Sequence, residues 1–296
     1  MSVPSPLDPA VVARLKTLSL RARTVVDGVL AGFHPSPQHG SSIEFAEHKQ
    51  YMPGDDIRFL DWKALARFDR LYIKKYEDET DLKAYLVLDV SDSMAYSGDG
   101  TVTKFDYART LAAAFLFLLH QQQDSAGMVF FTHRVTRHHS PRASGSLLTD
   151  GVKALEEARC EGKSDFAAAL NELAQVVTGR CMIIVLTDLL DASESALQLL
   201  GQLRLRHHDV SLFHLLHRDE VSFPFDTLTR FEGMEDERFA IAEPAAMRHA
   251  YLQTVQAFID ATRQQSLSAG IDYRLCITDQ PYDQVLVPFL KARMRR

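Results

Sequence analysis

The sequence contains few cysteines, no long apolar run and no concentration of basic residues, and each of these absences excludes a class of protein. Its three cysteines lie far apart and form no CxxC pair, so neither a zinc site nor a disulfide framework is indicated. No apolar stretch approaches the roughly 20 residues that a membrane-spanning helix needs. Charged residues interrupt the apolar stretch 18–30, so it does not have the form of a signal peptide. Together these features predict a cytoplasmic protein without a membrane span.

The charge and the absence of catalytic motifs argue against two further classes of function. The formal net charge is -6 and the basic residues are spread along the chain, which argues against a nucleic-acid partner. The sequence lacks the local motifs GxSxG and HExxH and the phosphate-binding motif GxxxxGK(S/T), so we expect that the protein is not an enzyme. The length and the ordinary composition of 46% hydrophobic and 24% charged residues suit one large domain with an appendage, or two small domains.

From residue 82 onward, strand patterns alternate with helix patterns. Short, nearly continuous apolar runs are typical of strands buried on both faces, and they cover 84–90, 126–131, 181–188, 210–216 and 273–278. Helical spacing covers 104–120, 147–158, 166–177, 192–205, 245–268 and 282–294. This alternation predicts an α/β fold, with a doubly wound, mostly parallel sheet and helices on both faces. We expect this domain over 81–296, an N-terminal extension over 1–80, and a polar hairpin insert at 229–241.

Oxygen-bearing side chains follow two of the predicted strands. Asp89, Ser91 and Ser93 come at the end of the first strand, and Asp188 ends the strand at 181–188. The carboxyl edge of an open α/β sheet is where ligands bind, and hard oxygens with few formal charges suit Mg²⁺ or Mn²⁺. Ser164 precedes a predicted helix and adds a further hydroxyl. A serine- and aspartate-rich segment after a strand is also commonly a loop that caps the next helix, and that interpretation stays open.

Three pieces of sequence, at 89–93, 163–170 and 186–188, resemble the metal-ion-dependent adhesion site of von Willebrand factor A domains. The resemblance implies that Asp89, Ser91 and Ser93, a hydroxyl from the second piece and Asp188 surround a divalent cation. Ser164 stands where that family has threonine, so the hydroxyl is kept and the methyl group is lost. In the family, the aspartate at the position of Asp188 often acts through a water.

A second resemblance covers nearly the whole chain. The segments 40–45, 51–67 and 74–77 are similar to the signature of the family called domain of unknown function 58, in which the signature leads into an A-type domain. This resemblance implies a partner, because such proteins are commonly encoded beside a MoxR-type AAA+ ATPase and are thought to be its adaptors. It does not imply an enzyme.

Arg58 and Trp62 stand out within the signature. Tryptophan and arginine are favoured anchors in protein interfaces, so these two residues are candidates for binding a partner. The alternative is a structural clamp, in which Asp61 and Arg67 form a buried pair that fixes the N-terminal segment beside Trp62.

The expected function is therefore that of a metal-dependent protein-binding module. A cation with an open coordination position accepts an Asp or Glu carboxylate from a partner, here expected to be the ATPase. Two alternatives remain at this stage: a scaffold that binds through the signature and has a vestigial metal site, and a metal-dependent hydrolase.

Overall fold

The computed structural model of the chain describes residues 5–31, 48–50, 72–74 and 82–294, except residues 99, 101, 144 and 191–193. The chain divides into two units, one made of Met1–Phe33 with Leu82–Arg296 and one made of His34–Asp81. The residues up to 33 thus group with the main domain. The sequence had predicted a single N-terminal extension over 1–80. In the smaller unit, strands β1 (His48–Gln50) and β2 (Tyr72–Lys74) pair antiparallel.

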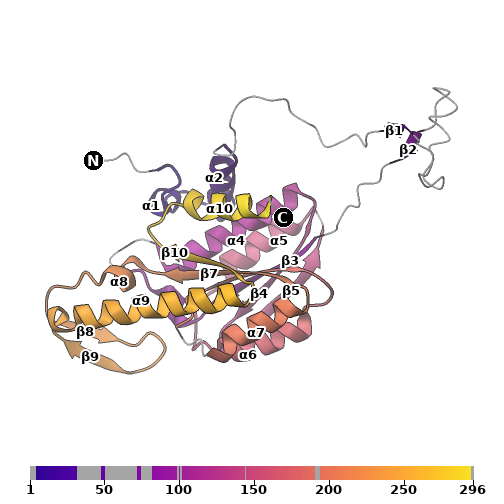
Figure 1. Ribbon diagram of the computed structural model, residues 1–296. Helices are drawn as coiled ribbons and strands as arrows, with labels where there is room; N and C mark the ends of the chain where they lie inside the picture. Colours follow the sequence, from indigo (N-terminus) through magenta and orange to yellow (C-terminus); the bar gives the residue numbers. More distant parts are fainter. Residues whose placement is uncertain are drawn as a thin grey trace. The chain divides into compact units, whose positions relative to one another are not determined.

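The larger unit is built on a six-stranded sheet with the strand order β10-β7-β6-β3-β4-β5. All neighbouring strands are parallel except β5, which runs antiparallel to β4 at one edge. The predicted doubly wound, mostly parallel sheet is therefore confirmed (Figure 1). The strands are β3 (Lys83–Asp89), β4 (Ser125–Phe131), β5 (Val135–Arg142), β6 (Met182–Thr187), β7 (Asp209–Leu216) and β10 (Asp272–Ile277). Strands β4 and β6 are buried along their whole length, as their continuous apolar runs indicate.

One face of the sheet is covered by helices from both ends of the chain. These are α2 (Leu18–Ala31), α4 (Lys104–Gln121), α5 (Leu147–Glu157) and α10 (Tyr282–Arg293), with the short α1 (Pro9–Val12) beside them (Figure 1). Phe115 of α4, Phe213 of β7 and Phe289 of α10 meet edge to face, with ring centroids 5.3 to 5.4 Å apart. This aromatic contact joins the C-terminal helix to the centre of the core.

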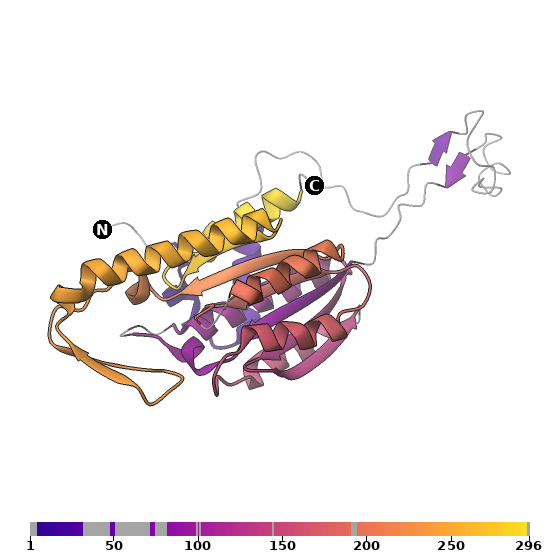
Figure 2. The same cartoon turned by 60° about the horizontal axis from the view of Figure 1, so that its bottom comes forward.

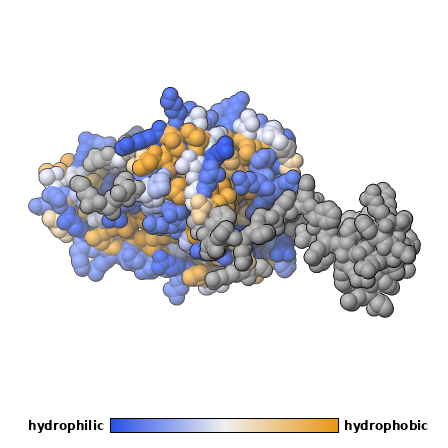
Figure 3. Space-filling view, turned by 90° about the horizontal axis from the view of Figure 1, so that it is seen from above, coloured by the Kyte–Doolittle hydropathy of each residue, from blue (hydrophilic) through white to orange (hydrophobic). Residues whose placement is uncertain are grey.

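The outer surface of this helical layer carries apolar side chains among polar ones, as Figure 3 shows from above. Val11 in α1 and Leu20 and Leu30 in α2 are among the exposed large apolar residues. Within the described part of the chain, no helix has the length and hydropathy that would let it cross a membrane.

The opposite face is covered by α6 (Phe166–Val176), α7 (Glu194–Leu205) and the long α9 (Pro244–Ser268). Figure 2 shows these helices on their side of the sheet. Their apolar side chains form a second core with the side chains of the central strands that point to this face, for example Val87 and Ile183 with Leu170 and Leu200. Two separate apolar cores on the two faces are what a sheet buried on both sides requires.

An insertion between β7 and α9 lies at the end of the sheet to which the parallel strands point (Figures 1 and 2). It contains α8 (Arg218–Ser222) and the antiparallel strands β8 (Thr229–Glu232) and β9 (Phe239–Ala242). The predicted hairpin is thus confirmed, and the Gly233 amide closes its turn with a hydrogen bond of 2.7 Å to the Arg238 carbonyl. The insertion positions its side chains over the carboxyl edge of the sheet, where the candidate site lies.

Candidate functional site

Asp89 is the centre of the candidate site. It is the last residue of β3, and its side chain is buried. Its Oδ1 accepts hydrogen bonds from the Ser91 amide at 3.0 Å and from the Ser91 hydroxyl at 2.7 Å. The Ser91 and Ser93 hydroxyl oxygens lie 3.1 Å apart at the start of the short 3-10 helix η2 (Asp92–Ala95). Three of the predicted ligands are therefore brought together by one tight turn.

Thr187 holds the other oxygen of Asp89. Strands β3 and β6 are neighbours, with Leu88 opposite Leu186, so Asp89 and Thr187 end side by side. The Thr187 hydroxyl donates a hydrogen bond of 2.7 Å to Asp89 Oδ2. The sequence placed Thr187 within a motif but did not assign it this contact. Its hydroxyl fixes the direction of the Asp89 carboxylate.

Asp188 is bound by a lysine that the sequence interpretation missed. The ammonium of Lys104 lies 2.7 Å from Asp188 Oδ2 and 2.9 Å from Glu220 Oε1, and the Lys104 and Asp188 side chains are both only 1% exposed. Burial by itself lowers the pKa of Lys104, but the two carboxylates outweigh it and the net shift is upward. Lys104 therefore carries a positive charge that offsets Asp188 from within the chain.

Asp89 has no such ammonium among its hydrogen-bond donors, which are two hydroxyls and one amide. Burial, and then the nearby Asp188 carboxylate, raise the pKa of Asp89 to about 7, against the smaller effect of the hydrogen bonds from Ser91 and Thr187. A divalent cation beside Asp89 would supply the positive charge that this carboxylate lacks. The oxygens of Asp89, Ser91 and Ser93 are the hard ligands that Mg²⁺ and Mn²⁺ prefer, so the donor set fits such a cation.

The acidic residues by themselves would not hold a cation here. Within the described ranges, no three His, Cys, Asp or Glu side chains are grouped as a metal site would need. A cation at Asp89 would therefore depend on the serine hydroxyls.

Ser164 lies in a loop beside this turn. The loop is joined to it by two backbone hydrogen bonds of 2.9 Å, from the Asp92 amide to the Gly162 carbonyl and from the Glu161 amide to the Val90 carbonyl. Ser164 itself is half-buried, and its amide donates a hydrogen bond of 3.0 Å to Glu235 Oε2 on the β8–β9 hairpin. The structure thus brings this segment to the site, and the role of the Ser164 hydroxyl as a ligand stays a prediction.

His214 contacts the backbone of Asp188. Its Nε2 lies 3.1 Å from the Asp188 carbonyl, which can only accept, so Nε2 carries the proton and Nδ1 accepts from the Tyr273 hydroxyl at 2.8 Å. Burial lowers the pKa of His214 to about 4, although the Asp188 carboxylate acts in the opposite direction. His214 is therefore a neutral core histidine that fixes the Asp188 backbone.

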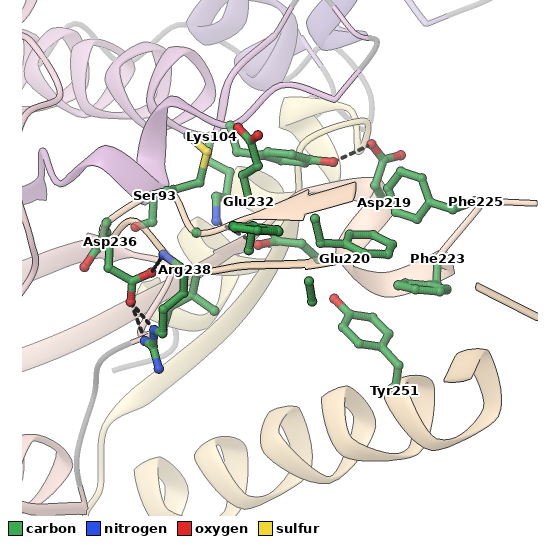
Figure 4. Close-up of a pocket in the computed structure, with 18 of the residues that line it drawn as sticks. Ser93, Lys104, Asp219, Glu220, Phe223, Phe225, Glu232, Asp236, Arg238 and Tyr251 are labelled. Carbon is green, nitrogen blue, oxygen red and sulfur yellow. Dashed lines mark hydrogen bonds and ion pairs between the residues drawn. The ribbon is translucent and has the colours of Figure 1, made fainter. Parts of the chain in front are cut away.

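A cavity of about 780 Å³ opens beside the site, between the carboxyl edge of the sheet and the insertion. Ser93 and Lys104 line it from the sheet side, as Figure 4 shows. Its far end is aromatic, and the rings of Phe223 and Tyr251 lie 4.4 Å apart there. A partner that approached the turn of Asp89 would enter this cavity.

The predicted partner-binding residues Arg58 and Trp62 lie outside the described residues. Neither the recognition surface nor the alternative clamp through Asp61 and Arg67 is tested by the structure.

The strand order, the antiparallel edge strand and the DxSxS turn at the carboxyl edge define a von Willebrand factor A-like domain. The family model described as protein of unknown function DUF58 matches residues 47–258, which is more than half of the chain. The chain belongs to this family, and the resemblance inferred from the signature is confirmed.

Two curated relatives are similar to parts of the chain. The uncharacterized protein Rv1480 of Mycobacterium tuberculosis is 29% identical over 191 residues, which are 62% of this chain and 58% of that protein. The uncharacterized protein YeaD of Bacillus subtilis is 38% identical over 77 residues, which are 26% of this chain and 19% of that protein. The match with Rv1480 thus spans less than two thirds of that relative's length.

Solved structures resemble the chain at low sequence identity. BatB from Bacteroides thetaiotaomicron has a TM-score of 0.48 at 14% identity, over 73% of this chain and all of BatB. The SpRpn10 VWA domain has a TM-score of 0.39 at 9% identity, over 69% of this chain and 93% of that domain. Since both scores are below 0.5, the functions of these proteins give no guide to the function of this chain.

Proposed function

We propose that the chain is a non-enzymatic protein-binding module that depends on a divalent cation, Mg²⁺ or Mn²⁺, and that it acts as an adaptor of a MoxR-type AAA+ ATPase. The observation that carries the proposal is the turn of Asp89. Its buried carboxylate is oriented through both oxygens by Ser91 and Thr187, beside two serine hydroxyls 3.1 Å apart. This is a preformed set of hard oxygen ligands that lacks only the positive charge.

Each residue around the turn has a part in this function. Asp89, Ser91 and Ser93 would hold the cation, and Asp188 would contribute through a water. When bound, the cation offers a coordination position to an Asp or Glu carboxylate of the partner. Lys104 holds the Asp188 carboxylate in place through its contact of 2.7 Å. The adjoining cavity leaves room for the partner's chain.

The state of the cysteines supports a binding module over an enzyme with a thiol nucleophile. Burial raises the pKa values of Cys160 and Cys181 to about 12. Both thiols therefore stay protonated at neutral pH, and a protonated thiol is a poor nucleophile.

A second candidate function is a scaffold with a vestigial metal site, and the position of Lys104 favours it. Its ammonium supplies, within the chain, the positive charge that Asp188 would otherwise share with a cation. In that case the partner would bind through the signature that contains Arg58 and Trp62. The two candidates differ in whether partner binding requires a cation.

The test is the affinity of the full chain for the MoxR-type ATPase of the same organism, measured with Mg²⁺ and with a chelator. The proposal expects tight binding with Mg²⁺ and a large loss with the chelator, and an equal loss for Asp89→Asn with Mg²⁺ present. Asp150→Asn changes an exposed carboxylate on α5 and is the matched control. Binding that survives the chelator and Asp89→Asn, and that is lost in Trp62→Ala, would establish the scaffold instead.

A further inference from the structure

The turn of the β8–β9 hairpin is held in a fixed shape. The Gly233 amide binds the Arg238 carbonyl, and the Arg238 amide donates a hydrogen bond of 2.9 Å to Asp236 Oδ1. The Arg238 guanidinium forms an ion pair with the same Asp236 carboxylate. A Cβ at position 233 would collide with the Asp236 carboxylate, so glycine allows the close approach within the turn. Glu235 lies in this turn, and its direction is thereby set.

Glu235 points its carboxylate toward the loop that carries Ser164. Its Oε2 accepts a hydrogen bond of 3.0 Å from the Ser164 amide. Its Oε1 is buried and accepts no hydrogen bond from any residue in the described part of the chain. A buried carboxylate oxygen without a partner is costly, so the position favours a positively charged group beside it.

The loop that Glu235 contacts is part of the candidate cation site. Gly162, two residues before Ser164, is bonded to the Asp92 amide within the Asp89 turn. Glu235 and Ser93 also line the same cavity. In Figure 4 the turn residues Asp236 and Arg238 and the site residue Ser93 line one end of this cavity, and Phe223 and Tyr251 line the other. The hairpin thus brings a carboxylate of the chain itself to the cavity that Ser93 also lines.

We propose that Glu235 is an internal ligand of the cation site, so that the β8–β9 hairpin closes the site until the carboxylate of a partner displaces it. This inference rests on the proposed function, because it assigns an occupant to the coordination position that a partner's Asp or Glu would take. A carboxylate is a ligand that Mg²⁺ accepts readily, and the glutamate from the chain needs no association step. The hairpin therefore regulates access to the cation by competition.

Amide hydrogen exchange combined with calorimetry tests this inference on the full chain, with Mg²⁺ as the probe. The variants are Glu235→Gln and, as the matched control in the same turn, Glu237→Gln, whose side chain is exposed. Glutamine keeps an oxygen that can accept from the Ser164 amide, so the substitution removes the charge and spares the local hydrogen bond.

The inference expects Mg²⁺ to slow exchange in the hairpin 229–242 and at the Ser164 amide in the wild type and in Glu237→Gln. In Glu235→Gln, the Mg²⁺ affinity should fall by about tenfold, and the hairpin should exchange at the same rate with Mg²⁺ and with a chelator. Equal Mg²⁺ affinity and equal protection in Glu235→Gln and the wild type would overturn the inference and leave the proposed function intact. A wild type that binds no Mg²⁺ would overturn both.

Discussion

The ammonium of Lys104 lies 2.7 Å from Oδ2 of Asp188, and both side chains are almost fully buried. Glu220 contacts the same ammonium at 2.9 Å from the insertion, so one lysine joins the sheet edge to the segment above it. The Lys104 ammonium thus offsets the charge of two carboxylates, of which the Asp188 side chain is 1% and the Glu220 side chain 19% exposed. Asp188 therefore has a positive charge beside it within the chain, whereas the hydrogen bonds of Asp89 come from uncharged groups.

Replacing Lys104 by methionine should destabilise the fold strongly. The substitution leaves two carboxylates near each other without their shared cation, and breaking a buried pair from one side costs about 3 to 5 kcal/mol. Urea denaturation measures this loss. Lys153→Met is the control, because the Lys153 side chain is 72% exposed and pairs with Glu157 on the surface of α5. A loss for Lys104→Met no larger than that of the control would contradict the importance of the pair.

Removing the hydroxyl of Thr187 should affect both stability and the cation site. Thr187→Val leaves Asp89 Oδ2 buried without its donor, which should cost about 1 to 3 kcal/mol in the free energy of unfolding. Because the hydroxyl also orients the carboxylate, the Mg²⁺ affinity should fall by about tenfold. Thr187→Ser keeps the donor and should stay close to the wild type in both measurements. If valine and serine behaved alike, the hydrogen bond of 2.7 Å would have no part in either property.

His214 should make the stability depend on pH in the acid range. Its pKa is about 4 in the folded chain and 6.5 for an unperturbed histidine. As the pH falls from about 6.5 to 4, the unfolded chain takes up a proton that the folded chain refuses, so the contribution of the neutral ring is complete above this window and is lost within it. Between these two pKa values, this one group should lower the free energy of unfolding by up to about 1.4 kcal/mol for each unit that the pH falls.

Urea denaturation at several pH values between 7 and 4 tests this in the wild type, His214→Gln and the exposed control His249→Gln. The difference in stability between the wild type and His214→Gln should shrink as the pH falls, and His249→Gln should follow the wild type. A difference that stays constant with pH would show that His214 does not titrate as described.

The sheet and the Asp89 turn could be predicted because their signals are local. Continuous apolar runs mark β3 and β6 as buried, and a strand that ends in Asp89 brings Ser91 and Ser93 to the same turn within four residues. The hairpin was likewise predicted as a polar insert at 229–241, and β8 and β9 form there. Such features depend on neighbours in the sequence, so the sequence suffices for them.

The partners of Asp188 could not be predicted, because they come from distant parts of the chain. Lys104 is 84 residues from Asp188, and Glu220 is 116 residues from Lys104. A lysine at one end of an amphipathic helix is typically solvated, so an exposed side chain is the ordinary expectation for Lys104. One signal was present: Lys104 is the first residue of α4, where the positive end of the helix dipole disfavours a cation, so another interaction has to compensate.

The contact between Ser164 and Glu235 could not be predicted from the sequence for the same reason. The two residues are 71 positions apart, and a glutamate in a polar hairpin turn is ordinarily a solvated residue. Only the fold shows that the hairpin lies over the carboxyl edge of the sheet and presents a carboxylate there.

The central claim is that the turn of Asp89 holds a divalent cation, and calorimetric titration of Mg²⁺ and Mn²⁺ into the full chain tests it most directly. The account predicts saturable binding to the wild type and to the exposed control Asp150→Asn, and no binding to Asp89→Asn, because the buried carboxylate supplies the charge on which the site depends. Absence of binding to the wild type, or unchanged binding to Asp89→Asn, would contradict the account.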